Sequence, residues 1–412
     1  MPSALAGLKV LDFSQNLAGP YCAMILADQG ADVIKVEPPG EGDAARDMPP
    51  FLGPEGRGES SPFMLWNRNK RGVVLDLKTA DGLAAARALG ERSDVLIENF
   101  RPGVLERLGL GYKFLSKRNK GLIWCSISGF GQTGPYRERG GYDLMTQAMS
   151  GLMAVCGEVD GPPLRLPIAI SDVAAGMFGA IGILSALQAR TRTGRGQQVD
   201  TSLFEAAVSL QVYEAAYFFA TGLRPPRLGQ KHRGSAPYQV FQTSNGWMTI
   251  GGSAQVMWTR LCRVLGMEHL LEDERFRANA GRVLHNDLLV DILSEKIKTQ
   301  STQHWADAMT AAGIPVGPVM THPEVFADPQ ILHRHMVVPV NHPTAGATRT
   351  LGVPVKLSRT PGRVRRPAPT LGQHTQEVLR ELRRAAATSK RKTPARKTKR
   401  ATKPARRARA KR

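Results

Sequence analysis

Leu166-Pro-Ile-Ala-Ile-Ser-Asp-Val-Ala-Ala-Gly-Met-Phe-Gly-Ala-Ile-Gly-Ile-Leu-Ser-Ala-Leu187 is the stretch around which the rest of the chain is organised. Small residues dominate it, among them Gly176, Gly179 and Gly182. A glycine costs about 1 kcal/mol in a helix interior, so three of them suggest that something approaches the helix backbone closely. The stretch therefore predicts a buried helix packed tightly against a neighbouring segment.

The carboxyl group of Asp172 lies at the start of this expected helix. At an N-cap position it would accept hydrogen bonds from free N–H groups and face the positive end of the helix dipole. Both effects favour the charged form, so we expect an ionised carboxylate at neutral pH. Taken alone, the pattern is typical of a capping aspartate on a core helix.

Several features favour a cytoplasmic protein without a membrane segment. The uncharged run 173–189 is shorter than the ~20 residues of a spanning helix, and it contains Ser185 and Gln188. The first ten residues lead into a strand-like segment and do not resemble a secretory signal. The cysteines are scattered, which is typical of reduced core thiols; they are Cys22, Cys125, Cys156 and Cys262.

The histidines and cysteines do not predict a metal site. The cysteines lack CxxC spacing, and the nine histidines form no HExxH or comparable ligand set. His333 and His335 are two residues apart, a spacing that surface placement explains. We therefore expect no metal ion in this protein.

The net charge of +21 is concentrated near the C-terminal end. Thirteen lysines and arginines and no acidic residue lie between Lys390 and Arg412, which leaves +8 for the remainder. The segment 385–412 is rich in Ala, Lys, Arg, Thr and Pro, offers no apolar face, and is expected to be disordered. It predicts either weak, salt-sensitive contact with nucleic acid or another polyanion, or a solvated tail without a partner.

Alternating strand and helix patterns predict a doubly wound α/β domain with a parallel sheet. A strand at 8–13, a helix at 18–29 and a strand at 31–36 form the first βαβ unit, and a Pro/Gly-rich surface loop follows at 38–62. Further strands are expected at 72–77, 94–98, 121–127 and 197–202, and further helices at 80–90, 104–108 and 203–219.

At 412 residues the chain is expected to hold two domains, because single cores rarely grow beyond ~250–300 residues. A Pro/Gly/Arg-rich linker at 221–234 would separate a large domain at 1–220 from a small α+β domain at 235–320. The segment 321–384 would return to the large domain. Within the second half we expect a hairpin around Ser244-Asn-Gly246, helices at 256–265, 287–298 and 303–312, and strands at 316–320 and 337–340.

One glycine motif is not interpreted as a nucleotide site. Gly129-Phe-Gly-Gln-Thr-Gly134 matches G-x-G-x-x-G and follows an expected strand. The residues after it, Pro135-Tyr-Arg-Glu-Arg-Gly-Gly141, do not form the amphipathic helix that a dinucleotide fingerprint requires. The motif therefore predicts a tightly turning loop.

A series of short motifs becomes specific through its order and spacing. The motifs are Asp12-Phe-Ser-Gln-Asn-Leu-Ala-Gly-Pro20, Leu26-Ala-Asp-Gln-Gly-Ala-Asp-Val-Ile-Lys-Val-Glu37, Asn69-Lys-Arg-Gly-Val-Val-Leu-Asp-Leu-Lys78, Asp94-Val-Leu-Ile-Glu-Asn-Phe-Arg-Pro-Gly103, Ser126-Ile-Ser-Gly-Phe-Gly-Gln-Thr-Gly-Pro135, Arg192-Thr-Gly-Arg-Gly-Gln197, Gly313-Ile-Pro-Val-Gly-Pro318, Asp328-Pro-Gln330 and Ala368-Pro-Thr-Leu-Gly-Gln-His-Thr375. Together, over residues 8–382, the chain resembles the family III CoA-transferases, which include formyl-CoA transferase and carnitine CoA-transferase.

The resemblance implies that Asp172 is the nucleophile of a CoA transfer between an acyl-CoA and a carboxylic acid. In that family the aspartate attacks the donor thioester and forms a mixed anhydride, which CoA thiolate converts into an aspartyl-CoA thioester. The acceptor acid then takes the CoA. This is covalent catalysis with a CoA thioester as substrate, and it implies no tightly bound cofactor.

The resemblance also implies the residues that contact CoA. They are Leu17, Ala18, Leu75, Lys78, Asn99, Phe100, Arg101 and Arg107. Cationic members suit the phosphates of CoA. Ser128 stands where formyl-CoA transferase has a lysine, so one phosphate contact of that enzyme is not implied here.

An oxyanion loop is implied at Gly251, Gly252 and Ser253, where formyl-CoA transferase has a run of four glycines. Because only part of that run is present, specificity for formate and oxalate is not implied. The family fold is a Rossmann-like large domain built from both chain ends, with a small inserted domain. Two such ring-like subunits interlock, so the resemblance implies a homodimer.

An acyl-CoA racemase of the same fold is the alternative activity. Racemases of this group pair the aspartate with a histidine from a Gly-His-Asp segment, because proton transfer on two faces needs an acid and a base. Here the segment is Gly141-Tyr142-Asp143. An unperturbed tyrosine titrates near ~10, which makes it a poor base at neutral pH and favours the transferase.

Overall fold

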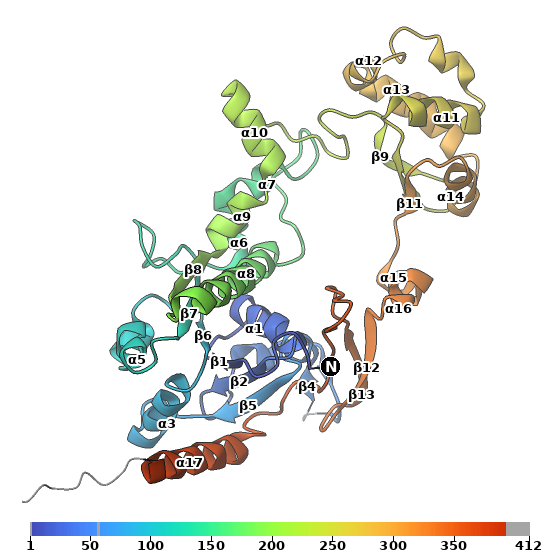
Figure 1. The fold of residues 1–412 in the computed structure, drawn as a ribbon. Coiled ribbons are helices and arrows are strands. Elements are labelled where there is room, and N and C mark those ends of the chain that lie inside the picture. Colours follow the sequence, from blue (N-terminus) through green and yellow to red (C-terminus); the bar gives the residue numbers. More distant parts are fainter. Residues whose placement is uncertain (1, 56–57, 393–412) are drawn as a thin grey trace, which may run out of the picture.

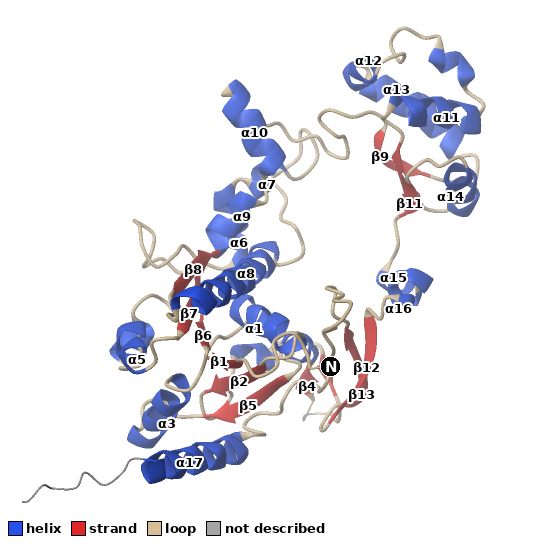
Figure 2. Cartoon of the chain, in the orientation of Figure 1, coloured by secondary structure: helices blue, strands red, loops and turns tan. Residues whose placement is uncertain are grey.

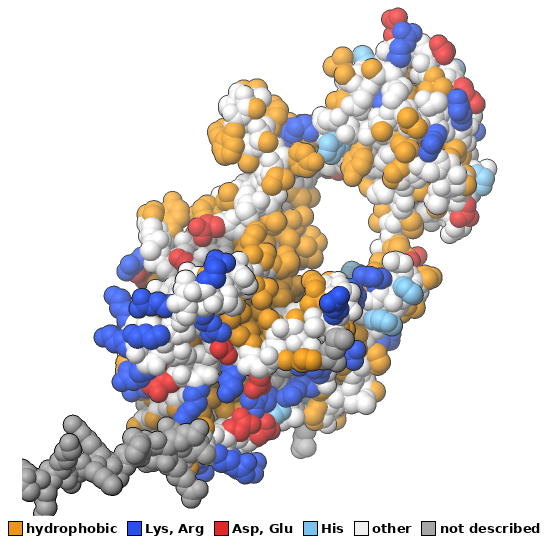
Figure 3. Space-filling model, viewed as in Figure 1, with side chains coloured by type: hydrophobic (Ala, Val, Ile, Leu, Met, Phe, Trp, Pro, Cys, Tyr) orange, Lys and Arg blue, Asp and Glu red, His pale blue; other side chains and the backbone are white. Residues whose placement is uncertain are grey.

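The computed structural model of the chain describes residues 2–55 and 58–392. These residues form two lobes that are joined by two separate segments (Figure 1). One segment, 222–237, leads into the small lobe, and the chain returns near 319–321. An opening lies between the two connections, so the chain outlines a ring (Figure 3).

The large lobe is built on a six-stranded parallel sheet with the order β5-β2-β1-β6-β7-β8. The strands are β1 (Lys9–Asp12), β2 (Asp32–Glu37), β5 (Lys70–Val74), β6 (Val95–Glu98), β7 (Ile123–Ser128) and β8 (Gln198–Ser202). Val10 of β1 lies opposite both Val33 of β2 and Val95 of β6. The strand order therefore reverses between β1 and β6, the arrangement that creates a ligand crevice at their carboxyl ends. The predicted α/β fold with a parallel sheet is confirmed.

Helices cover both faces of this sheet (Figures 1 and 2). They are α1 (Ala18–Asp28), α3 (Ala80–Gly90), α4 (Val104–Arg107), α5 (Tyr112–Arg118), α8 (Ile170–Thr193) and α17 (Thr375–Lys392). The short helices α6 (Asp143–Ser150) and α7 (Leu152–Val155) follow one another, and α6 packs beside α8. One core joins α1 and α8 to strand residues such as Val10 and Ile127. The other joins α3, α4, α5 and α17 to residues such as Leu11 and Trp124. Side chains that alternate along each strand thus fill two cores.

Close contacts of α8 with α1 and with the sheet explain the three glycines of α8. A Cβ atom on Gly176 would lie 2.7 Å from the carbonyl oxygen of Ala18, and one on Gly182 would lie 2.5 Å from Cγ1 of Val199. A Cβ atom on Gly179 would lie 2.9 Å from Cδ1 of Ile127. A side chain at Gly176 would collide with the backbone of α1, and one at Gly179 or Gly182 would press on a side chain of the sheet. The predicted close approach is confirmed.

Among the described residues, α8 is the one helix that is long and apolar enough to cross a membrane, with a mean hydropathy of 1.7 over its most apolar window. In that window 44% of the residues are buried within the chain, against α1 and the sheet. A core helix of a soluble protein has the same composition, so length and hydropathy alone are weak evidence for a membrane span.

The helix expected at 203–219 is interrupted. The structure has α9 (Leu203–Ser209) and α10 (Val212–Thr221) instead. Gln211 leaves the helical conformation, with φ −90° and ψ +47°, and its side-chain amide donates to the carbonyl oxygen of Ser150 at 2.6 Å. This contact with α6 redirects the chain, and the hydrophobic pattern of the sequence does not record it.

The small lobe packs helices on a three-stranded antiparallel sheet with the order β11-β10-β9. Its elements are β9 (Tyr238–Gln242), β10 (Trp247–Gly251), α11 (Gln255–Leu265), η2 (Glu268–Leu271), α12 (Asn279–Leu284), α13 (Asn286–Ile297), α14 (Thr302–Ala311) and β11 (Val316–Pro318). Trp258, Phe276 and Trp305 lie in its core. The predicted hairpin is confirmed, with Gln242 opposite Trp247.

The chain then returns to the large lobe. It passes through α15 (His322–Ala327), α16 (Pro329–His333), the antiparallel pair β12 (Val337–His342) and β13 (Gly346–Leu351), and α17. Because α17 extends to Lys392, residues 385–392 are helical, and the prediction of disorder is wrong for them. The remainder of the predicted tail, 393–412, lies outside the described residues.

The loop expected at 38–62 is only partly a surface loop. It contains η1 (Ala44–Asp47), β3 (Phe51–Leu52), β4 (Glu59–Ser60) and the first residues of α2 (Ser61–Trp66). Asp43 and Ala45 within it are fully buried. The segment therefore contributes charged and apolar groups to the interior of the large lobe.

Candidate active site

A pocket opens at the carboxyl ends of the parallel strands, where the strand order reverses. It encloses about 950 Å³, its open mouth included. Residues from the ends of β1, β6, β7 and β8 meet there with α8 and the loop before α6; they are Gln15, Asn16, Ala18, Asn99, Phe100, Arg101, Pro102, Ile127, Ser128, Gly129, Arg137, Arg139, Gly140, Gly141, Tyr142, Asp172 and Leu203. This is the position at which open α/β sheets bind ligands.

Asp172 lines this pocket from the first turn of α8 but is not its N-cap. The cap residue is Ala169, whose own side chain makes no capping hydrogen bond. The predicted capping role is therefore wrong. Instead, the backbone N–H of Ala18, in the first turn of α1, donates a hydrogen bond to Asp172. Two helix starts thus meet at one carboxyl group.

The environment of Asp172 also reverses the expected ionisation. Burial raises the pKa of Asp172, the negative charge of Asp143 raises it further, and the hydrogen bond from Ala18 opposes them. The resulting pKa is about 7, against an ordinary value of 3.8. Loss of hydration outweighs the helix dipole here. Near neutral pH the group is divided between its protonated and ionised forms.

Asp143 is a site residue that the sequence analysis did not assign. One of its carboxylate oxygens accepts the backbone N–H of Ser171 at 2.9 Å, and the other accepts Nε2 of Gln147 at 2.7 Å. The Gln147 Oε1 atom in turn accepts the N–H of Leu166 at 2.9 Å. Asp143 therefore holds the start of α8 and places a second negative charge near Asp172. Its position beside Tyr142 was the available signal.

The glycine motif at 129–134 forms a loop, as predicted, and no helix follows it before α6. A Cβ atom on Gly129 would lie 2.8 Å from the Cα atom of Gly141, so the two ends of the loop touch. This close contact brings Arg137 and Arg139 to the pocket beside Arg101. Three guanidinium groups make the pocket suitable for an anionic ligand.

Two strand-end loops are tied together at the pocket. The N–H of Gln15 donates to Oδ1 of Asn99 at 2.8 Å, and Nδ2 of Asn99 donates to the carbonyl oxygen of Gln15 at 2.7 Å. The next residue, Phe100, donates its N–H to Glu98 at 3.0 Å. Burial raises the pKa of Glu98 to about 7. These contacts fix the loop after β1 relative to the loop after β6.

A family model described as CoA-transferase family III matches residues 5–375 of the chain. The chain belongs to CoA-transferase family III.

The relatives of this family III chain support the assignment. Succinyl-CoA:glutarate CoA-transferase of Mus musculus is 38% identical over 92% of this chain and 86% of its own length. Acetyl-CoA:oxalate CoA-transferase of Acetobacter aceti is 39% identical over 91% and 95%. The crystal structure of a CAIB/BAIF family protein from Brucella suis has a TM-score of 0.85 and 38% identity, covering 93% of this chain and 100% of that chain. The predicted family is confirmed, and the protein is a CoA-transferase.

The pocket of this family III chain contains some of the residues predicted to contact CoA but not others. Ala18, Asn99, Phe100 and Arg101 line it. The others lie beside it or apart: Leu17 precedes α1, Leu75 is buried in the second core, Lys78 follows β5, and Arg107 ends α4. Ser128 lines the pocket, and its hydroxyl accepts the N–H of Gly131 at 3.0 Å.

The predicted oxyanion loop of this family III chain lies in the small lobe. Gly251 is the last residue of β10, and Gly252 and Ser253 follow it. The carbonyl oxygen of Ser253 accepts a hydrogen bond from the buried Arg282 at 2.6 Å. Within one chain the small lobe lies across the opening from α8 (Figure 1). The structure does not bring these residues to Asp172 in a single subunit.

Over the described residues, no group of three or more His, Cys, Asp or Glu side chains is arranged to hold a metal ion. Tyr142, on which the racemase alternative depends, lines the pocket with its side chain largely exposed. The relatives named above are CoA-transferases, so they lend that alternative no support.

Proposed function

We propose that this protein transfers CoA from an acyl-CoA donor to a carboxylic acid through covalent intermediates on Asp172. The observation that carries the proposal is the carboxyl group itself. It lies at the strand-end pocket, largely stripped of water, and it is held by one backbone N–H in a pocket with three arginines. A desolvated carboxylate with a raised pKa is a stronger nucleophile than one in water.

In the proposed reaction, an oxygen of Asp172 attacks the thioester carbonyl carbon. The C–S bond breaks, CoA leaves as the thiolate, and a mixed anhydride remains. The thiolate attacks the aspartyl carbonyl carbon and releases the donor acid, which gives an aspartyl-CoA thioester. The acceptor carboxylate displaces CoA in the same way, and the thiolate then attacks the acyl carbon of the acceptor. Asp172 is restored as a carboxylate, so the cycle needs no external oxidant or base.

The residues around Asp172 have separate roles in this proposal. The N–H of Ala18 orients one carboxylate oxygen and leaves the other free to attack. Arg101, Arg137 and Arg139 bind anionic groups of the substrates, namely CoA phosphates or a second carboxylate. The acceptors named for several relatives are dicarboxylic acids, such as glutarate and oxalate. We propose the same class for this chain.

The proposal includes an interlocked homodimer. Large apolar side chains on α8 and α10 are exposed in one chain; they are Met177, Phe178, Ile181, Leu184, Val212, Tyr213, Phe218 and Phe219. Apolar surface borders the opening between the lobes (Figure 3). A surface of this kind is typical of a permanent interface. A second copy that passes through the opening would cover it and could bring its own Gly251–Ser253 segment to Asp172.

The assembly is tested by dilution. At nanomolar concentration, mass photometry should still report dimers, because separating the subunits would require unfolding. A folded monomer that transfers CoA would contradict the interlocked arrangement.

The chemistry is tested by trapping. The enzyme is incubated with succinyl-CoA and hydroxylamine, and the peptide that contains Asp172 is analysed by mass spectrometry. A hydroxamate on Asp172 is expected, and it should depend on acyl-CoA. A matched sample with glutarate and without hydroxylamine should form glutaryl-CoA. Transfer that proceeds normally in Asp172→Ala would refute the mechanism.

A further inference from the structure

A cluster of buried charges contacts the β1–α1 loop, whose Asn16 lines the pocket. Lys35 and Asp43 form an ion pair of 2.7 Å, and Lys70 and Asp12 form another of 2.8 Å. All four side chains have 0% exposure. Burying an ion costs free energy unless the ion has an opposite charge and hydrogen-bond partners nearby, so the contacts of each of these four groups matter.

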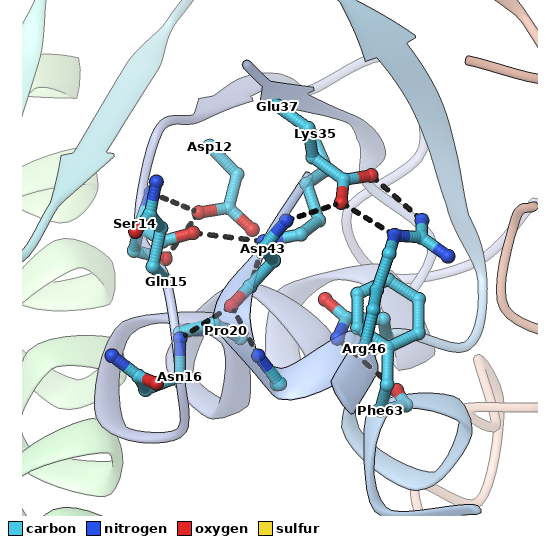
Figure 4. Close-up of polar contacts among 12 residues, drawn as sticks. Asp12, Ser14, Gln15, Asn16, Pro20, Lys35, Glu37, Asp43, Arg46 and Phe63 are labelled. Atoms are coloured by element: carbon cyan, nitrogen blue, oxygen red, sulfur yellow. Dashed lines mark hydrogen bonds and ion pairs between the residues drawn. The ribbon is translucent and has the colours of Figure 1, made fainter. Parts of the chain in front are cut away.

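The first pair holds the loop between β1 and α1. Nζ of Lys35 donates to the carbonyl oxygen of Ser14 at 2.8 Å, and Oδ1 of Asp43 accepts the N–H of Asn16 at 2.9 Å. Figure 4 shows Asp43 between Lys35 and the backbone of Asn16. The ion pair therefore holds two residues of the loop by hydrogen bonds, Ser14 through its carbonyl oxygen and Asn16 through its N–H.

The second pair anchors both ends of the same loop. Oδ1 of Asp12 accepts the N–H of Ser14 at 3.0 Å, and Nζ of Lys70 donates to the carbonyl oxygen of Pro20 at 2.9 Å. Nζ of Lys70 also donates to Asn67 at 2.9 Å. The loop is thus fixed where it leaves β1 and where it enters α1.

The loop has a conformation that needs such support. Asn16 has φ +61°, in the left-handed region that non-glycine residues rarely adopt. Two residues later, the N–H of Ala18 donates to Asp172. The hydrogen bond to the carboxyl group therefore depends on backbone geometry that the ion pairs enforce.

Asp43 is itself held by residues of the 38–62 segment. Its N–H donates to Oε2 of Glu37 at 3.0 Å, and Arg46 binds both oxygens of Glu37 at 2.7 Å. The Arg46 guanidinium also stacks on Phe63, 3.8 Å from the ring centroid. These contacts fix the position of the Asp43 carboxylate, and its hydrogen bond with the N–H of Asn16 in turn fixes the backbone of Asn16 (Figure 4).

We propose that Lys35 and Asp43 are positioning residues that hold the β1–α1 loop so that the N–H of Ala18 meets Asp172. The inference rests on the proposed function of Asp172, although the geometry it concerns can be measured without turnover. Neither residue touches the pocket. Their effect reaches the carboxyl group through Ser14, Asn16 and Ala18.

The readout is the ionisation of Asp172. One backbone hydrogen bond lowers a carboxyl pKa by roughly 0.5–1 unit, so its loss should raise the acid limb of the kcat/KM pH profile by that amount. The other charged or titratable groups around Asp172 come from elements other than the β1–α1 loop; they are Asp143, Arg101, Arg137, Arg139 and Tyr142.

The test compares Asp43→Ala with Asp28→Ala. Asp28 and Arg68 form a third buried ion pair of 2.7 Å, at the far end of α1 from the loop. Both variants should lower Tm. Only Asp43→Ala should shift the acid limb upward, from near pH 7 in the wild type. Equal shifts in both variants, or no shift in Asp43→Ala, would overturn the proposal.

The double variant Lys35→Met, Asp43→Leu removes both charges and leaves no buried ion unpaired, so it serves where Asp43→Ala does not fold. It should recover Tm and keep the upward shift. If the acid limb of the kcat/KM profile in the double variant stayed at the wild-type pH, the Lys35–Asp43 pair would not position Ala18, and the proposal would be refuted.

Should the wild type transfer no CoA, the proposed function fails, but the inference can still be tested. A carboxyl-carbon NMR titration, assigned with Asp172→Asn, measures the pKa of Asp172 directly. The same upward shift in Asp43→Ala is expected, and an unchanged value would refute the positioning role.

Discussion

Two groups of buried carboxyl groups lie on either side of the β1–α1 loop, and they differ in what faces them. Asp12 and Asp43 each form an ion pair with a lysine. Burial acts to raise the pKa of Asp12, but the charges of Lys70 and Lys35 outweigh it, and the pKa lies below its usual value. Asp172 faces Asp143 and one N–H, and its pKa is raised to about 7.

The comparison teaches that burial does not decide the role of a carboxyl group in this fold. The paired groups are fixed as ions and hold backbone. The unpaired group keeps a poorly stabilised charge, which suits it to attack a carbonyl carbon. Four changes should break or sharpen this contrast.

The largest effect is expected from exchanging Asp172 for asparagine. The amide keeps the shape but cannot form the anhydride, so CoA transfer should fall by at least about a thousandfold. Formation of glutaryl-CoA from succinyl-CoA and glutarate measures the loss. Circular dichroism should show an unchanged fold. Substantial residual transfer would place the nucleophile elsewhere.

The same exchange at Asp12 should produce the opposite pattern. Asp12→Asn leaves Lys70 buried without its counterion, which should cost about 3–5 kcal/mol of unfolding free energy. Asp172→Asn should cost nothing at pH 8, because it removes a charge with no cationic partner. Denaturant unfolding at one fixed protein concentration compares the two. Equal destabilisation would mean that the two carboxyl groups are equivalent.

The pH dependence of stability should separate the wild type from Asp172→Asn. The pKa of Asp172 is higher in the folded chain, at about 7, than its ordinary value of 3.8. Its proton therefore stabilises the folded state fully below about pH 4, and this contribution is lost as the pH rises through 7. After allowance for partial hydration we expect roughly 2–3 kcal/mol.

This contribution is measured as the change in unfolding free energy between pH 5 and pH 8 in the wild type, minus that in Asp172→Asn. The wild type should lose more stability. Parallel curves for the two proteins would indicate an ordinary carboxyl pKa.

The smallest effect is expected from Asp143→Asn. Removing the neighbouring negative charge should lower the pKa of Asp172 by about 1 unit. The acid limb of kcat/KM should move to lower pH, the reverse of the shift expected for Asp43→Ala. An acid limb that stays near pH 7 would leave burial alone as the cause of the raised pKa.

Much of the fold followed from local patterns in the sequence. The strands of the sheet could be predicted because buried parallel strands are continuous apolar runs, and the α3 helix was predicted between two of them. The glycines of α8 correctly predicted a close neighbour. Membership of family III followed from ordered motifs. Asp172, Ala18, Asn99, Phe100 and Arg101, which the same resemblance named as site residues, line one pocket, and their roles stay predictions.

What the sequence could not show depends on contacts between distant segments. The pKa of Asp172 was mispredicted because Asp143 approaches it only once the loop 129–142 has folded. The break at Gln211 depends on the carbonyl of Ser150. Arg137 and Arg139 line the pocket because Gly129 contacts Gly141, and this contact between two distant glycines is not visible in the sequence.

Gly176 limits which substitutions the start of α8 can accept. It lies one helical turn after Asp172 on α8, and a Cβ atom there would meet the carbonyl oxygen of Ala18 at 2.7 Å. The N–H of that same Ala18 donates to Asp172. Ala18 therefore contacts α8 through both of its backbone polar groups. Its carbonyl oxygen occupies the space that a side chain at Gly176 would fill, and its N–H donates to the Asp172 carboxyl group. The distance between the starts of α1 and α8 therefore depends on the missing Cβ atom of Gly176. A Gly176→Ala substitution would push the two helix starts apart and lengthen the hydrogen bond to Asp172.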